Sequence, residues 1–170
     1  MYLFVLSVFL IAGCATPDIY TPANHNVRLY YADLNGDGIK EVVETQDDSA
    51  RDPSTLVTIR NNNKAGQVIE SMVVDGTIKN IEFAELNFDE KAWMVVHFTG
   101  KDTFPAVAVY AFNNNALSKI FEASSAQGIE VDLDAPARIR IGKSPQNSLS
   151  PNRIPERETW VWSGGKFVRD

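Results

Sequence analysis

Hydrophobic and polar positions alternate along much of this chain with a period of two residues. Val57 and Ile59 are separated by the polar Thr58, and Val107 and Val109 repeat the pattern. A period of two places alternate side chains on one face of a β-strand, whereas a helix would need a period of 3.6. These windows show no helical period, so the pattern predicts an all-β fold.

Turn residues divide the first part of the chain into four short segments rich in β-branched and aromatic residues. The predicted strands cover 27–32, 41–45, 55–60 and 67–73. Such segments, spaced closely along the chain, favour an antiparallel meander of four strands. A four-stranded meander is the unit that forms one blade of a β-propeller.

The sequence also matches itself at an offset of 52 residues without a gap. Residues 29–70 align with 81–122 over 42 positions, of which eleven are identical. The alignment predicts that Leu34 and Leu86 occupy equivalent core positions, and that Val57 and Val109 do the same. A repeat of this length indicates a fold built from successive similar units.

The last part of the chain is interpreted as a third, degenerate copy. The domain from 27 to 170 then divides into repeats at 27–76, 77–127 and 128–170. In the third repeat we expect strands near 129–133, 137–141 and 159–162, then a turn at 163–165 and a last strand at 167–168. Three blades are fewer than the roughly 4–8 of closed propellers. The chain must therefore close with three sheets, pack as a sandwich, or complete a ring with another copy, which would make it an oligomer.

An apolar segment precedes the predicted domain. Residues 2–12 are apolar except for Ser7, and this run is shorter than the roughly 20 residues that a membrane-spanning helix requires. It is followed by Ile11-Ala12-Gly13-Cys14, which resembles the bacterial lipoprotein signal. The resemblance implies that residues 1–13 are removed, that Cys14 is lipidated, and that residues 14–26 form a tether. An uncleaved membrane anchor is the alternative.

These features locate the protein and exclude several classes of function. The resemblance implies a lipid-anchored protein of the bacterial cell envelope, and Ala15 after the cysteine favours the outer membrane. Cys14 is the sole cysteine among 170 residues, which excludes an internal disulfide and a thiolate metal site. The formal charge of −6 provides no basic field for nucleic acid. The predicted partner of this protein is therefore the membrane, to which the lipid on Cys14 would attach it.

A short acidic stretch between the first two predicted strands carries the most specific chemistry. Residues 33–41 read Asp-Leu-Asn-Gly-Asp-Gly-Ile-Lys-Glu. The stretch resembles the calcium loop of the FG-GAP and VCBS repeats found in integrin-like propellers. The resemblance implies one structural Ca²⁺ held by side chains of Asp33, Asn35, Asp37 and Glu41 and by the carbonyl of Ile39. Calcium prefers 6–8 oxygen ligands, and the two glycines permit the positive φ angles of a tight loop.

Two other interpretations of this stretch remain open. The same residues fit an EF-hand with Glu44 as the twelfth-position ligand, but that motif requires flanking helices. Alternatively, Asn35-Gly36 is a common type I′ hairpin turn, which needs no metal.

The second repeat weighs against a second metal site. It retains Glu85, Asn87 and Asp89 but replaces Gly36, Gly38 and Glu41 by Phe88, Glu90 and Trp93. We therefore expect one calcium site.

No catalytic motif emerges, and we expect a protein that is not an enzyme. His25 and His97 lack visible partners, and Asp132 and Asp134 are interpreted as a solvated face of a strand. The leading hypothesis is a non-enzymatic binding or scaffold lipoprotein with a structural calcium loop. The alternative is a glycan-binding or glycan-processing accessory protein, in which Trp160 and Trp162 form the ligand face. For these two tryptophans, burial between sheets is the competing interpretation.

Overall fold

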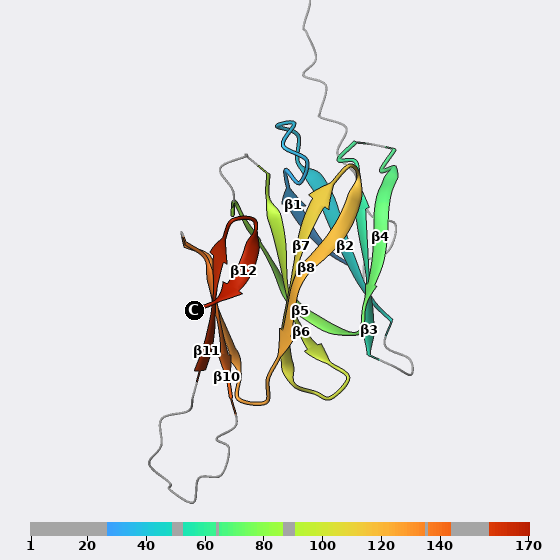
Figure 1. The fold of residues 1–170 in the computed structure, drawn as a ribbon. Helices are drawn as coiled ribbons and strands as arrows, with labels where there is room; N and C mark the ends of the chain where they lie inside the picture. Colours follow the sequence, from blue (N-terminus) through green and yellow to red (C-terminus); the bar gives the residue numbers. More distant parts are fainter. Residues whose placement is uncertain (1–26, 49–52, 64, 87–90, 135, 144–156) are drawn as a thin grey trace, which may run out of the picture.

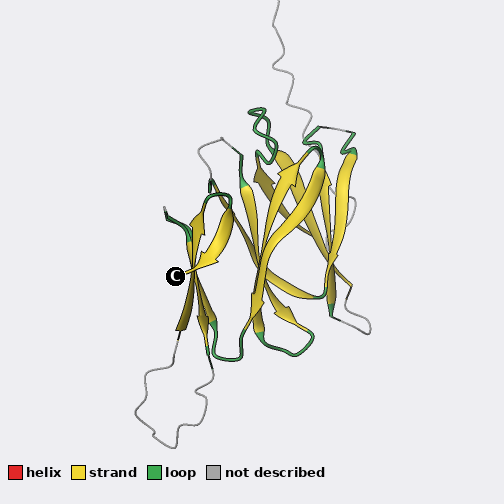
Figure 2. Cartoon of the chain, viewed as in Figure 1, coloured by secondary structure: helices red, strands yellow, loops and turns green. Residues whose placement is uncertain are grey.

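The computed structural model describes residues 27–48, 53–63, 65–86, 91–134, 136–143 and 157–170. Throughout these ranges the regular structure is β-strand and no helix is present, as Figure 2 shows. The predicted all-β fold is confirmed. Within the same ranges, no helix is long and apolar enough to cross a membrane.

Twelve strands form three antiparallel sheets of four, each in simple meander order. The first sheet contains β1 (Val27–Ala32), β2 (Glu41–Asp48), β3 (Ser54–Arg60) and β4 (Val68–Val74). The second contains β5 (Gly76–Ala84), β6 (Trp93–Gly100), β7 (Pro105–Asn113) and β8 (Ala116–Ser124). The third contains β9 (Ile129–Asp132), β10 (Arg138–Gly142), β11 (Arg157–Ser163) and β12 (Lys166–Arg169). The predicted architecture of three four-stranded meander units is therefore confirmed.

The three sheets stand as layers, with the second sheet in the middle (Figure 1). One face of the second sheet packs on the first sheet, in a core that includes Val57, Ile59, Met94 and Val96. Its other face packs on the third sheet, in a second core around Val95, Val107, Ile139 and Trp162. Because both of its faces are covered, β7 is a nearly continuous run of buried residues.

Of the expected routes, the described residues follow the face-to-face packing of a sandwich, but with three layers in place of two and without closure within one copy. The three sheets form neither a barrel nor a two-layer sandwich, and the stack is open at both ends. Among the described residues, no further sheet covers the outer face of the first sheet or the outer face of the third.

The alignment of the repeats assigns the predicted core residues to the correct face of their sheets, but it does not always match residues with the same pairing position. Leu34 lies in the first core and Leu86 against the second, so these two leucines occupy corresponding places on successive sheets. Val57, however, pairs with Thr45, whereas Val109 pairs with Val95. Since Thr45 corresponds to His97, whose partner is Val107, the strict counterpart of Val57 is Val107 and not Val109.

This correction has a simple geometric reason. Eleven residues separate Thr45 from its partner Val57, whereas nine separate His97 from its partner Val107, so the second repeat is two residues shorter between equivalent positions and the pairing moves by two. A shift of two preserves the alternation of faces in a strand, so Val57 and Val109 both remain in a core.

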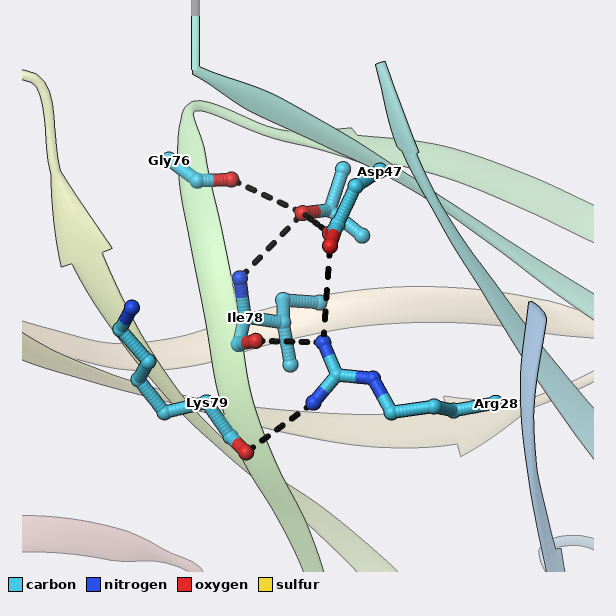
Figure 3. Close-up of polar contacts among 6 residues, drawn as sticks. Arg28, Asp47, Gly76, Ile78 and Lys79 are labelled. Atoms are coloured by element: carbon cyan, nitrogen blue, oxygen red, sulfur yellow. Dashed lines mark hydrogen bonds and ion pairs between the residues drawn. The ribbon is translucent and has the colours of Figure 1, made fainter. Parts of the chain in front are cut away.

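A polar junction joins the first sheet to β5 (Figure 3). A bulge between Ile78 and Asn80 interrupts the pairing of β5 with β6. The Arg28 guanidinium donates hydrogen bonds to the carbonyl oxygens of Ile78 at 2.6 Å and Lys79 at 3.2 Å. It also lies 3.8 Å from the Asp47 carboxylate. The bulge thus exposes carbonyl groups that a side chain of the neighbouring sheet satisfies.

Thr55 completes this junction from the third strand. Its hydroxyl oxygen accepts a hydrogen bond from the Ile78 backbone N–H at 3.2 Å and lies 3.0 Å from the Gly76 carbonyl oxygen. The hydroxyl is also 2.9 Å from Asp47 Oδ1. Thr55 is fully buried, so these contacts satisfy polar groups that would otherwise be desolvated without partners.

Candidate functional site

The acidic stretch forms the connection between β1 and β2. The last pair of this hairpin is Ala32 with Glu41, so residues 33–40 constitute the loop. A two-residue type I′ turn at Asn35-Gly36 would need pairing up to Leu34 and Asp37, and this turn is not what forms. The flanking elements are strands, so the EF-hand interpretation is wrong.

Glu44 gives a second reason against an EF-hand. It lies three residues after Glu41 on β2, and side chains at odd spacing point to opposite faces of a strand. Its carboxylate accepts a hydrogen bond from Arg60 Nε at 3.0 Å on the outer face of the first sheet. Glu44 therefore cannot share one ion with Glu41.

The base of the loop is fixed to the hydrophobic core. Leu34 is buried in the first core, while the Asp33 carbonyl oxygen accepts a hydrogen bond from the Ala92 N–H at 2.9 Å. The Leu34 N–H in turn donates to Glu41 Oε2 at 2.8 Å. The loop therefore begins and ends at positions held by the first and second sheets.

Side-chain oxygens organise the backbone of the loop. The Asp33 carboxylate accepts hydrogen bonds from the N–H groups of Gly36, Asp37 and Gly38 at 2.8, 3.2 and 2.7 Å. Asn35 Oδ1 accepts one from the Asp37 N–H at 2.8 Å, and Asp37 Oδ1 accepts one from the Ile39 N–H at 2.7 Å. Gly36 and Gly38 have φ angles of 79° and 82°, as the sequence predicts.

Glu41 is the buried acid of the loop, with 4% of its surface exposed. Burial raises the pKa of its carboxyl group, and the charges of Asp37 and Asp33 raise it further, while backbone hydrogen bonds, including that from Leu34, oppose the shift. The negative charge of Glu41 is thus held in an unfavourable environment.

The Asn35 amide links the carboxylates of this loop. Its Nδ2 donates to Glu41 Oε1 at 2.9 Å and to Asp37 Oδ2 at 3.1 Å. In the described part of the chain, no three His, Cys, Asp or Glu side chains are grouped so as to hold a metal ion. The amide hydrogens therefore occupy the region between Asp37 and Glu41, where a cation would also be attracted.

The donor set of the loop is chemically suited to a hard cation. Asp33, Asp37 and Glu41 supply carboxylate oxygens, Asn35 supplies an amide oxygen, and Ile39 supplies a carbonyl. A carboxylate oxygen has two acceptor sites, so an N–H bond leaves capacity for a metal. Oxygen-only donors of this kind suit calcium rather than zinc or copper.

Several predicted residues lie outside the described part of the chain. These are Cys14, His25, Asn87, Phe88, Asp89 and Glu90, together with the signal and tether that the sequence predicts. His97 lies on β6, with its Nε2 3.4 Å from Glu82 Oε1. Asp132 lies on β9 at 4.0 Å from Arg140, and its Oδ1 accepts a hydrogen bond from the Asp134 N–H.

Trp160 and Trp162 both pack toward the second sheet, Trp160 half-buried and Trp162 buried. Trp162 is buried, with its ring centroid 4.7 Å from that of Trp93 on β6. Trp160 packs edge-on against Phe121 of β8 at 5.4 Å. The predicted ligand face is therefore part of the second core, which agrees with the competing interpretation of burial between sheets.

A different surface, which the sequence analysis missed, is the outer face of the first sheet. Four large apolar side chains on it are exposed: Tyr31 by 42%, Leu56 by 39%, Val68 by 48% and Val73 by 63%. Cross-strand pairing places them on one face. Leu56 pairs with Val73, and Arg60, four residues after Leu56 on the same face of β3, pairs with Val68 beyond a bulge in the pairing of β3 with β4. Arg60 also pairs with Val42, which pairs with Tyr31. They are four of the six large hydrophobic residues that are exposed in the described ranges. The sequence did contain a signal for this surface, because the same strands carry apolar residues at consecutive positions and therefore on both of their faces.

The outer face of the third sheet is charged instead. Glu130 accepts hydrogen bonds from Arg140 at 3.1 Å and from Arg157 at 2.6 Å, and Arg138 and Asp132 pair across β10 and β9. Side chains that form ion pairs with one another in this way are typical of the solvent-facing surface at the end of a stack of repeats.

Comparison with known proteins finds no family model, no curated protein and no solved structure that matches this chain.

Proposed function

We propose that this protein is a non-enzymatic binding or scaffold module of the bacterial cell envelope, held to the membrane by a lipid on Cys14. The binding surface in this proposal is the outer face of the first sheet. The observation that supports it is the gathering of four exposed apolar side chains on this face, among them Leu56 and Val73. Apolar patches of this kind mark interaction sites on soluble domains.

Calcium has a structural role in the proposal. A cation held by Asp33, Asn35, Asp37, Ile39 and Glu41 would offset the charge of the buried Glu41 and fix the connection between β1 and β2. It would rigidify the end of the first sheet next to the proposed binding surface.

The glycan hypothesis receives less support. It required an exposed aromatic platform, and the rings of Trp160 and Trp162 pack against Phe121 and Trp93. A sugar could not stack on the buried Trp162 ring without separating the second and third sheets, and Trp160 is half-buried against the same core.

Site-specific photo-crosslinking in intact envelopes tests the proposed function. A photoreactive residue replaces Leu56 on the first sheet, and in the matched control it replaces Arg138 on the outer face of the third. We expect discrete protein adducts from position 56 and none from position 138. An absence of adducts from position 56 would contradict the proposal.

A further inference from the structure

The outer face of the first sheet is equivalent to a face that is already an interface in this molecule. In the repeat alignment, Leu29 and Tyr31 correspond to Ile81 and Phe83, and Val42 corresponds to Met94. Ile81 and Met94 are buried in the first core and Phe83 packs against it, where the second sheet meets the first. The first sheet thus presents outward the same face that the second sheet buries against a neighbour.

The chemistry of this outer face also suits burial. Val42 is fully buried within the face, and Thr58 is nearly so. Its two central charges neutralise each other, since Arg60 Nε lies 3.0 Å from Glu44 Oε2. The Arg60 guanidinium is further held by the Gly66 carbonyl oxygen at 3.1 Å. This central ion pair therefore adds no net charge to the face.

The third sheet does not supply a matching surface for a head-to-tail contact. Its outer face carries the ion pairs of Glu130 with Arg140 and Arg157. Burying these charges against Leu56 and Val73 would cost their hydration without new partners. The outer face of the first sheet thus exposes apolar side chains, whereas the outer face of the third sheet carries charged side chains that pair with one another.

We propose that two copies of this chain associate through the outer faces of their first sheets, related by a two-fold axis. This inference rests on the proposed function and names the partner of its binding surface. A two-fold contact closes on itself because the same patch serves both copies. The dimer is then a stack of six sheets, with the apolar faces in the centre and the charged third sheets at both ends.

The size of the face is consistent with a reversible dimer. Four strands spaced about 4.8 Å apart, each about seven residues long, cover a flat area of about 450 Å² per copy. Two such faces approach the roughly 1,000 Å² that a specific interface requires, and the relief of the side chains adds to this area. We therefore expect an association that depends on concentration.

Sedimentation of the full chain in mild detergent, over a wide range of protein concentration, measures the association. Leu56→Lys places a charge on an inner strand of the proposed interface and should raise the dimer dissociation constant about tenfold or more. Thr159→Lys, on the third strand of the third sheet, is the matched control and should leave the constant unchanged. Equal weakening by both substitutions would indicate a head-to-tail contact and overturn the two-fold arrangement.

Disulfide trapping gives a second measurement that does not depend on weakening the fold. In a Cys14→Ser background, Leu56→Cys should yield a covalent dimer under mild oxidation, whereas Thr159→Cys should not. A chain that stays monomeric at all concentrations and forms no disulfide would refute the dimer. If photo-crosslinking at position 56 then yields an adduct with a different protein, the proposed binding function stands and only the identity of its partner is wrong.

Discussion

At the scale of single residues, the acidic loop is the part of the molecule whose binding chemistry depends most on individual side chains. Asp33 organises the backbone of the loop, while Asn35 bridges Asp37 and Glu41 through its amide. If calcium replaces this bridge, binding to the folded state alone stabilises the protein by about 2.7 kcal/mol at a hundredfold excess over Kd.

The calcium prediction is tested by thermal unfolding in calcium and in chelator. Chelator should lower the Tm of the wild-type chain, and Asp37→Ala should abolish this difference. Glu41→Gln should also abolish it, because the amide retains an acceptor for the Leu34 N–H but removes the charge. Glu44→Gln is the control on the opposite face of β2 and should keep the calcium response. Identical unfolding of the wild type in both solutions would show that the loop binds no calcium.

Glu158 provides a prediction about pH. Its hydrogen bond with Lys143 lowers the pKa of the carboxyl group, and Arg169, 3.3 Å away, lowers it further. A carboxyl group with a lowered pKa in the folded state stabilises the protein above its ordinary value of 4.5, and this stabilisation is lost as the pH falls through the folded pKa. Glu158→Gln should therefore lower Tm at pH 7, and the difference from wild type should shrink below pH 4.5. A difference that stays constant from neutral to acid pH would contradict this assignment.

At the scale of elements, the contact between the first and second sheets depends on a very short connection. Only Asp75 separates β4 from β5, and Gly76 begins β5 at a point where a Cβ atom would lie 2.3 Å from the Thr99 carbonyl oxygen. A real Cβ atom cannot be this close to a backbone oxygen, so β5 or β6 must shift. The Arg28 and Thr55 hydrogen bonds at the same junction would shift with it.

Gly76→Ala should therefore destabilise the protein by about 2 kcal/mol or more, through overpacking against backbone. Gly100→Ala is the matched control, because Gly100 pairs with Gly76 across the two strands and its Cβ would meet nothing within 4 Å. Urea unfolding of both variants measures the difference. Equal free energies of unfolding for the two variants would show that this connection tolerates a side chain.

At the scale of the whole molecule, the proposed function depends on the lipid anchor. If Cys14 is lipidated, the wild-type chain should partition into the detergent phase, and Cys14→Ser should move the processed domain into the aqueous phase. Leu56→Lys controls for an effect of the exposed face and should partition like the wild type. Aqueous partitioning of the wild-type chain would remove the anchor from the proposal.

Local sequence pattern determined the strands and the loop of this protein. Alternating residues such as Val57, Thr58 and Ile59 predict a strand because side chains of a strand alternate between its two faces. The first three predicted strands begin within one residue of β1, β2 and β3. The acidic loop follows equally from Asp33 and the two glycines, because the hydrogen bonds made by its side chains join residues no more than seven positions apart.

Only the tertiary structure decided which faces are buried and which are open. Trp160 and Leu56 both lie on strands with apolar neighbours, yet the first packs against Phe121 and the second remains exposed. The order of three sheets in the stack determines this difference, and no local pattern specifies it. The junction between Arg28 and the bulge at Ile78 is equally a contact between residues 50 positions apart. Such contacts depend on how the sheets meet, so they could not be derived from alternation along one strand.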